Sequence, residues 1–173
     1  MIPINLTHQV ILTRSMHARL LSPHTQHLDS SEPGPKPLTP LRHTLSTLLT
    51  YFADTYKATF GFEDGPPLHD ALTIAYIARP ELFQCKRYRV DVELAGLHTT
   101  GETVVDVWNY RSCDNSWGRH GKNCLVAESV DVRAGFLVQE ACPLTFLLKV
   151  PGFFALFLEA VDKCDKISPL NIK

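Results

Sequence analysis

Apolar side chains recur every three or four positions between Thr39 and Gly61, which is the spacing of an amphipathic helix. Thr39 is a suitable N-cap, Pro40 suits the first helical position, and Gly61 suits the position just after a helix end. The predicted apolar face consists of Leu41, Leu45, Leu48, Leu49, Phe52 and Tyr56. We expect this helix to pack against a sheet with that face.

Two shorter helices and one long loop are predicted elsewhere. Thr13 can cap a helix that carries Met16 and Leu20 on one side, and residues 152–163 predict a mostly apolar helix. Residues 22–40 are rich in proline, serine, histidine and glycine, which indicates an exposed loop.

Strand patterns account for much of the remaining chain. Residues 1–12 favour β-structure without a break, which suits a buried strand in a largely parallel sheet. Residues 88–94 and 103–110 flank a turn at 96–101, so they predict a hairpin or two adjacent strands. Residues 125–132 predict a further strand. This mixture of helices and strands indicates the α/β class.

One predicted helix combines an apolar surface with two ionisable side chains. Pro66 and Pro67 restrict the backbone before it, and Pro80 ends it. His69 and Asp70 lie in its first turn, and burying either costs several kcal/mol unless it has a partner. We expect the helix to be buried on most faces, because it is apolar nearly all round through Leu72, Ile74, Ala75, Tyr76 and Ile77.

His69 and Asp70 are expected to reach different targets, because neighbouring helical residues point about 100° apart. The helix N-terminus favours the ionised form of Asp70, whose oxygens then suit calcium or magnesium. His69 can donate a proton or a hydrogen bond near neutral pH. Short motifs are weak, however, and from this stretch alone a capping carboxylate and a satisfied core histidine are the commoner case.

The length, net charge and cysteine content limit the number of domains, the kinds of partner and the compartment that we expect. The 173 residues suffice for a single domain with a core, and the net charge of −1 gives no case for nucleic acid or an anionic membrane as a partner. We find no apolar run of the roughly 20 residues that span a membrane, and no secretory signal. The odd, scattered set of cysteines predicts reduced thiols and a cytoplasmic protein: Cys85, Cys113, Cys124, Cys142 and Cys164.

Several stretches, taken in order, resemble the C-terminal half of the nucleoside hydrolases, the inosine–uridine preferring N-ribohydrolases that include uridine nucleosidases. These stretches are residues 1–9, 66–83, 90–96, 99–106, and 123–132 with 151–161. The resemblance implies one partial domain over residues 1–173. The implied fold is the C-terminal part of a three-layer α/β domain whose central sheet is mixed and mostly parallel.

The same resemblance implies a reaction and roles for individual residues. Members of this family hydrolyse the N-glycosidic bond of purine or pyrimidine ribonucleosides in nucleoside salvage, and the full-length enzymes are expected to be homo-oligomers. The histidine that matches His69 contacts or protonates the leaving base, and the aspartate that matches Asp70 ligates calcium. The segment 56–65 lies beside the base, so Phe60 and Phe62 are candidates to stack on it. We assign Tyr56 instead to the core-facing side of its helix.

Two departures from the family pattern qualify these expectations. The aspartate-rich loop D-x-D-P-G-x-D-D and the residues that grip ribose do not occur in this sequence. Calcium takes about six to eight oxygen ligands, and Asp70 offers at most two, so we expect this chain alone neither to bind calcium nor to hydrolyse nucleosides. The alternatives are a non-catalytic fragment or degenerate paralogue that acts only by associating with another subunit, and a faulty gene model of a complete enzyme.

The second departure is a segment, residues 133–150, that separates the predicted last strand from the predicted last helix. In the family these two elements follow one another almost directly. We interpret the segment as an insertion foreign to the family, either a translated intron or a surface insertion. The apolar content of the segment counts against a surface insertion, because such an insertion would leave an exposed apolar patch prone to association.

Overall fold

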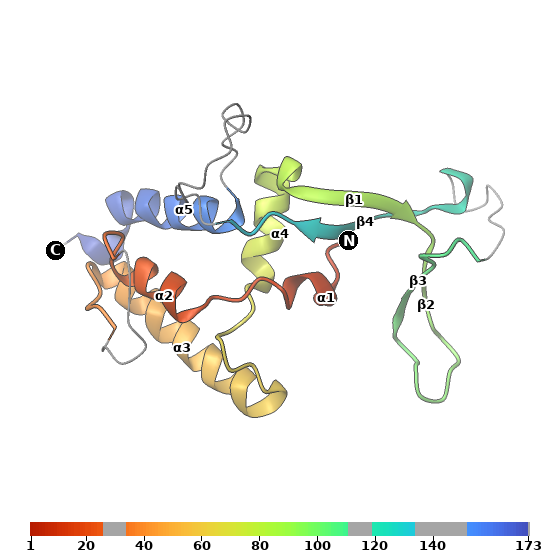
Figure 1. Ribbon diagram of the computed structural model, residues 1–173, viewed down its shortest axis with the longest axis horizontal. Coiled ribbons are helices and arrows are strands. Elements are labelled where there is room, and N and C mark those ends of the chain that lie inside the picture. Colours follow the sequence, from red (N-terminus) through yellow and green to blue (C-terminus); the bar gives the residue numbers. More distant parts are fainter. Residues whose placement is uncertain (26–33, 111–118, 134–151, 173) are drawn as a thin grey trace, which may run out of the picture. The chain divides into compact units, whose positions relative to one another are not determined.

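The computed structural model describes residues 1–25, 34–110, 119–133 and 152–172. These residues form two compact units (Figure 1). One unit comprises Met1–Leu6 and Phe83–Val130 and contains the strands. The other comprises Thr7–Leu82 and Asp131–Lys173 and contains most of the helices.

The strand-containing unit is built on two antiparallel pairs. β1 (Phe83–Tyr88) pairs with β4 (Cys124–Val130), and β2 (Val90–Val92) pairs with β3 (Thr103–Val105). A short 3₁₀ helix, η3 (Arg119–Gly121), precedes β4. The predicted hairpin is confirmed as β2 and β3, although both strands are shorter than expected. β4 confirms the predicted last strand, whereas sequence patterns missed β1.

Glu93 organises the turn between β2 and β3. Its side chain accepts hydrogen bonds from the backbone N–H groups of Ala95 (2.8 Å) and Gly96 (3.0 Å), and these bonds lower the pKa of the Glu93 carboxyl. Gly101 has a φ of 90°, a conformation that side chains disfavour, and its N–H donates to the Glu93 carbonyl at 2.7 Å. Local hydrogen bonds therefore define this turn.

The described residues of the helical unit form four longer helices and two 3₁₀ turns. The helices are α2 (Arg14–Leu21), α3 (Pro40–Phe60), α4 (His69–Ala78) and α5 (Phe153–Ile167). The turns are η1 (Pro80–Leu82) and η4 (Pro169–Asn171). Two predicted caps are confirmed, because the hydroxyls of Thr13 and Thr39 accept from backbone N–H groups of α2 and α3. Gly61 ends α3 in the left-handed conformation, as expected.

The predicted strand over residues 1–12 is wrong for its first half. Residues Ile4–Thr7 form a short helix, α1, and Leu6 N–H donates to the Pro3 carbonyl at 3.0 Å. Pro3 has a fixed φ that favours this turn over a continuous strand. The segment 10–12 is extended, but it pairs with a segment that contains Pro66 and Pro67, and proline cannot donate to a ladder. Only an isolated bridge forms there.

The expected parallel sheet is not found in the described part of the chain, where both sheets are antiparallel. The predicted packing of α3 against a sheet is also wrong, since α3 contacts α2, α5 and η4. Several of its apolar residues remain exposed, among them Leu48 at 62% and Tyr51 at 75%. The mixture of helices and strands nevertheless fits the α/β class.

α4 is less buried than its composition predicts. Leu72 and Ala75 are buried, but Ile74 is 64% and Ile77 is 76% exposed. α4 packs mainly against α5 and η1, and its first residue, His69, also contacts Thr7 and Tyr56. No helix among the described residues has the length and hydrophobicity needed to cross a membrane.

The core of the helical unit includes a buried arginine that the apolar pattern of α3 does not indicate. Arg42 is 1% exposed, and its guanidinium contacts the carboxylates of Asp162 and Asp165 on α5. It also donates to the Leu20 carbonyl at 2.5 Å. Burial would raise the pKa of Asp165, but hydrogen bonds from Thr39, Arg42 and Asn171 outweigh burial and hold the pKa below its ordinary value. We name these contacts the Arg42 network.

The segment 133–150 lies almost wholly outside the described residues, and so does Cys142. Its two flanks lie together, because Phe153 N–H donates to the Asp131 carbonyl at 2.7 Å. A side chain at Gly152 would overlap the backbone of Arg133. The interpretation of residues 133–150 as an insertion foreign to the family stays a prediction. Of the predicted loop 22–40, residues 26–33 also lie outside the described residues, as does Cys113 of the loop before β4.

Candidate functional site

His69 is the first residue of α4, and the backbone just before it is hydrogen-bonded to the extended segment 10–12. Leu12 N–H donates to the Pro66 carbonyl at 2.9 Å, and Leu68 N–H donates to the Val10 carbonyl at 3.0 Å. Gly65 precedes this segment with a φ of 136°, which a residue with a Cβ rarely adopts. These contacts bind the start of α4 to the extended segment 10–12.

Both ring nitrogens of His69 have hydroxyl partners. Nδ1 lies 2.7 Å from Oγ1 of Thr7, and Nε2 lies 2.8 Å from the hydroxyl of Tyr56. The partners come from different elements, since Thr7 ends α1 and Tyr56 lies on α3. Two hydrogen bonds on opposite sides fix the plane and direction of the imidazole.

Aromatic rings surround His69 on several sides. The ring centroids of His8 and His69 are 5.5 Å apart, and those of Tyr56 and His69 are 5.7 Å apart. Phe62 lies 5.0 Å from His8 and 5.6 Å from Tyr56, also between centroids. We define the His69 cluster as His8, Phe52, Tyr56, Phe60, Phe62 and His69.

The structure brings the two predicted base-stacking residues to this cluster in different ways. Phe62 is half-buried against His8 and Tyr56, whereas Phe60 is 62% exposed and contacts Tyr56 at 5.1 Å between centroids. Tyr56, which was assigned to the core-facing side of its helix, is half-buried, its hydroxyl contacts His69 and its ring belongs to the cluster. An exposed Phe60 beside a half-buried Phe62 leaves aromatic surface accessible.

The environment of His69 disfavours its protonated form. Burial lowers the pKa of His69 below its ordinary value, the neighbouring His8 lowers it further, and Asp70 offsets part of this effect. His8 contributes a second feature, since its Nε2 atom is buried and has no hydrogen-bond partner in the part of the chain that the structure describes. An unpaired buried nitrogen is costly, and it is available to a ligand that reaches it.

Asp70 lies beside His69 in sequence but is exposed to solvent. The two side chains therefore have different surroundings, as their positions on the helix predict. The described ranges contain no group of three or more histidine, cysteine, aspartate or glutamate side chains arranged to hold a metal ion. The predicted role of Asp70 as a metal ligand stays a prediction.

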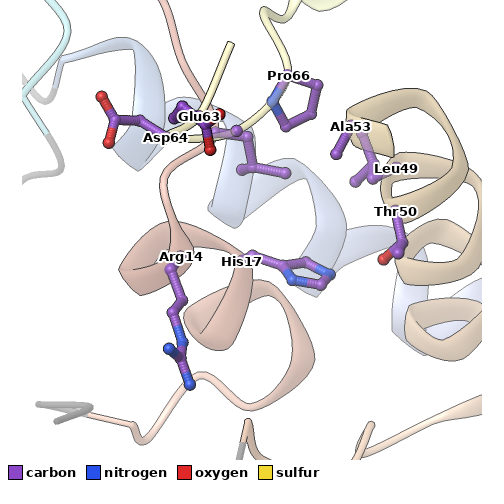
Figure 2. Close-up of a pocket in the computed structure, with 10 residues that line it drawn as sticks. Arg14, His17, Leu49, Thr50, Ala53, Glu63, Asp64 and Pro66 are labelled. Carbon is purple, nitrogen blue, oxygen red and sulfur yellow. The ribbon is translucent and has the colours of Figure 1, made fainter. Parts of the chain in front are cut away.

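A separate pocket of about 200 Å³ lies between α2, α3 and the segment 63–66 (Figure 2). Its lining does not include any predicted site residue. The His17 ring points toward Thr50 in Figure 2, and its Nε2 lies 2.8 Å from the Ser46 hydroxyl. Burial lowers the pKa of His17. The His69 cluster, and not this pocket, joins the residues that the sequence singles out.

Comparison with known proteins assigns the chain to a family. The pattern of the family described as "Inosine-uridine preferring nucleoside hydrolase" matches residues 1–136, well over half of the sequence. The chain belongs to this family. The matched range includes every member of the His69 cluster.

The chain matches only part of the length of each relative. The chain is 35% identical over 164 residues to the "Probable ribonucleoside hydrolase" of Dictyostelium discoideum, covering 95% of this chain and 38% of that protein. It is 44% identical over 71 residues to the "Pyrimidine-specific ribonucleoside hydrolase RihA" of Enterobacter sp. (strain 638), covering 40% of this chain and 22% of that protein. This member of the nucleoside hydrolase family thus spans well under half the length of these relatives.

A solved structure supports the fold. The "Purine-Preferring Ribonucleoside Hydrolase from Gardnerella vaginalis" aligns with a TM-score of 0.62 and 21% identity, covering 97% of this chain and 40% of that chain. At that identity the likeness supports the fold alone. The names of these relatives specify pyrimidine in one case and purine in another, so family membership does not select a base.

Sequence reasoning missed Thr7 and His8 as members or neighbours of the site. Both lie in the stretch that was expected to be a buried strand. Two adjacent polar side chains in such a strand require partners, and that requirement was the available signal. Their partners, His69 and Phe62, are more than 50 residues away in the sequence, and periodicity carries no information over that distance.

Proposed function

We propose that this chain provides the base-binding side of a ribonucleoside N-glycosidase. The observation that carries the proposal is the His69 imidazole, fixed through both nitrogens inside a cluster of aromatic rings in a nucleoside hydrolase family member. Aromatic faces suit a planar purine or pyrimidine base, and Phe60 and Phe62 are the residues we assign to stack on it.

The proposed reaction is hydrolysis of the bond between the base and ribose. When that C–N bond breaks, its electron pair passes to the base, which leaves more readily if it receives a proton or a hydrogen bond. His69 is the group that we assign to this step, and the Tyr56 hydroxyl at 2.8 Å from its Nε2 can relay the proton. The lowered pKa of His69 means that its protonated form gives up the proton readily.

Calcium binding requires more ligands than the described residues bring together. Asp70 is exposed and can contribute one carboxylate, but calcium takes about six to eight oxygens. Among the described residues, Asp70 does not belong to any group of three or more histidine, cysteine, aspartate or glutamate side chains that could hold a metal ion. We propose that Asp70 serves as a calcium ligand only when further oxygens come from outside the described residues.

We further propose that the chain acts in nucleoside salvage in the cytoplasm. The cysteines that the structure describes, Cys85, Cys124 and Cys164, are free thiols, which suits a reducing compartment. A second candidate function is that of a non-catalytic subunit that associates with another chain, as a homo-oligomer or with a complementary partner. The exposed Ile74 and Ile77 on α4 favour this alternative, because association would bury them.

Nucleoside binding by the purified chain tests the proposed function. Uridine and inosine are added in the presence of calcium, while the imidazole signals of His69 are followed by NMR and base release is followed by chromatography. We expect saturable shifts of the His69 signals with either nucleoside and no base release.

Two controls define the outcome of this test. A Phe62→Ala variant should weaken binding roughly tenfold, since aromatic stacking on a base is worth about 1–3 kcal/mol. A His98→Ala variant, altered at an exposed histidine in the other unit, should bind like the original chain. Absence of any shift would overturn the assignment of the His69 cluster to base binding, and calcium-dependent base release would overturn the expectation that the chain is inactive alone.

A further inference from the structure

Thr7 is buried at 4% exposure and has its hydroxyl oxygen 2.7 Å from Nδ1 of His69. It is the last residue of α1, and His69 is the first residue of α4, so two elements meet at this hydrogen bond. The contact lies on the side of the imidazole away from Tyr56. Thr7 therefore contacts the proposed acid–base group without belonging to the aromatic cluster itself.

A neutral imidazole carries one N–H, and its two partners decide which nitrogen bears the proton. A phenolic hydroxyl is a better hydrogen-bond donor than the aliphatic hydroxyl of a threonine. Tyr56 is therefore the partner that donates, and the His69 Nε2 atom, 2.8 Å from its oxygen, accepts. The remaining ring nitrogen, Nδ1, then bears the proton and donates it to Oγ1 of Thr7.

We infer that Thr7 is a positioning residue that holds His69 in the tautomer protonated at Nδ1. In that form Nε2 presents a lone pair toward Tyr56 and the aromatic cluster, so it is the nitrogen that gains and releases a proton there. When the ring is protonated, Thr7 still accepts from Nδ1, and the orientation of the imidazole does not change. This inference rests on the proposed role of His69, but the tautomer can be measured without any nucleoside.

The surroundings of the ring reinforce this assignment. His8 and Tyr56 flank the imidazole, with ring centroids 5.5 Å and 5.7 Å from that of His69. These contacts restrict rotation of the imidazole, and a ring flip would place Nε2 against Thr7. A serine at position 7 would retain the acceptor oxygen, whereas a valine would retain the shape and remove it. The two substitutions therefore separate hydrogen bonding from packing.

The experiment uses the whole chain labelled with ¹⁵N at histidine, without nucleoside, at a pH where His69 is neutral. We expect Nδ1 of His69 to show the shift of a protonated nitrogen and Nε2 that of an unprotonated one. Thr7→Val should lower the ratio of the Nδ1–H to the Nε2–H tautomer about fivefold, the amount that one ordinary hydrogen bond supplies. Thr7→Ser should restore the original ratio, and Tyr56→Phe should leave Nδ1 protonated.

The outcomes are distinguishable from failure of the proposed function. An Nε2–H tautomer in the original chain overturns the inference. That measurement does not depend on whether any variant folds. An unchanged ratio in a folded Thr7→Val chain overturns it as well, with folding checked by thermal unfolding. If the tautomer follows this pattern while uridine and inosine do not bind, then Thr7 positions His69 and the proposed function fails alone.

Discussion

Replacement of Arg42 by methionine is expected to lower the free energy of unfolding by about 3–5 kcal/mol, the usual cost of removing one partner from a buried ion pair. The guanidinium is 1% exposed and contacts Asp162 and Asp165, so the substitution leaves carboxylates without their cation. It also leaves the Leu20 carbonyl without its donor. Urea denaturation followed by circular dichroism measures the change.

The control for this prediction is Arg79→Met. Arg79 pairs with Glu81, but both side chains are substantially exposed, and such surface pairs contribute only about 0–1 kcal/mol. A comparable loss of stability in both variants would contradict the role assigned to the Arg42 network. Asp165→Asn should be more damaging than Asp162→Asn, because the side chain of Asp165 is 12% exposed and that of Asp162 is 49% exposed.

The Arg42 network also predicts how stability depends on pH. The pKa of Asp165 lies below its ordinary value in the folded chain, so its contribution to stability is present above the pKa of the unfolded carboxyl, about 3.9. That contribution is lost as the pH falls through the folded pKa. We expect the difference in stability between the original chain and Arg42→Met to shrink below pH about 4. An undiminished difference at lower pH would contradict this coupling.

Local patterns predicted the elements whose ends are determined by nearby residues. The caps at Thr13 and Thr39 and the left-handed glycine after α3 depend on contacts within a few positions. The β2–β3 hairpin is similarly local, since Glu93 binds the backbone of its own turn. These features could be predicted because the sequence supplies both partners of each contact.

Long-range contacts account for the incorrect predictions. The β-favouring start of the chain forms α1 and an isolated bridge, because its partner segment contains Pro66 and Pro67. The apolar face of α3 predicted packing on a sheet, but the buried side chain of α3 is Arg42, whose partners lie on α5. Composition alone does not identify which face of a helix receives a partner from a distant segment.

The same distinction applies to the site. His69 could be singled out because an ionisable residue in an apolar helix requires a partner, but the pattern did not identify that partner as Tyr56 or Thr7. Tyr56 also fits the helical spacing of the apolar face, so periodicity favoured the core assignment. The resemblance to nucleoside hydrolases singled out Phe60 and Phe62, whose rings the structure places against Tyr56, because a resemblance carries information about spatial neighbours that spacing does not. Their role in stacking on a base stays a prediction.

Gly65→Ala is expected to destabilise the helical unit by at least about 3 kcal/mol, since backbone strain of this kind alone costs about 1–3 kcal/mol. Gly65 has a φ of 136°, which suits glycine almost exclusively, and an added Cβ would overlap the carbonyl oxygen of Leu12. That carbonyl belongs to the extended segment that holds Pro66 and Leu68 in place before His69. Relief of the overlap requires this backbone approach to open, which would also displace the imidazole from Thr7 and Tyr56.

Gly61→Ala is the matched control, because Gly61 also has a positive φ, 73°, but no atom lies within 4 Å of an added Cβ. A left-handed conformation at a residue with a Cβ costs roughly 1–2 kcal/mol, so this variant should lose less stability. Denaturation measures both losses, and the NMR signals of His69 should shift in Gly65→Ala only. Equal losses, or an unperturbed His69 in Gly65→Ala, would show that the approach of Leu12 does not position the site. The comparison therefore separates the conformational preference of glycine from the steric demand that joins the segment 10–12 to the start of α4.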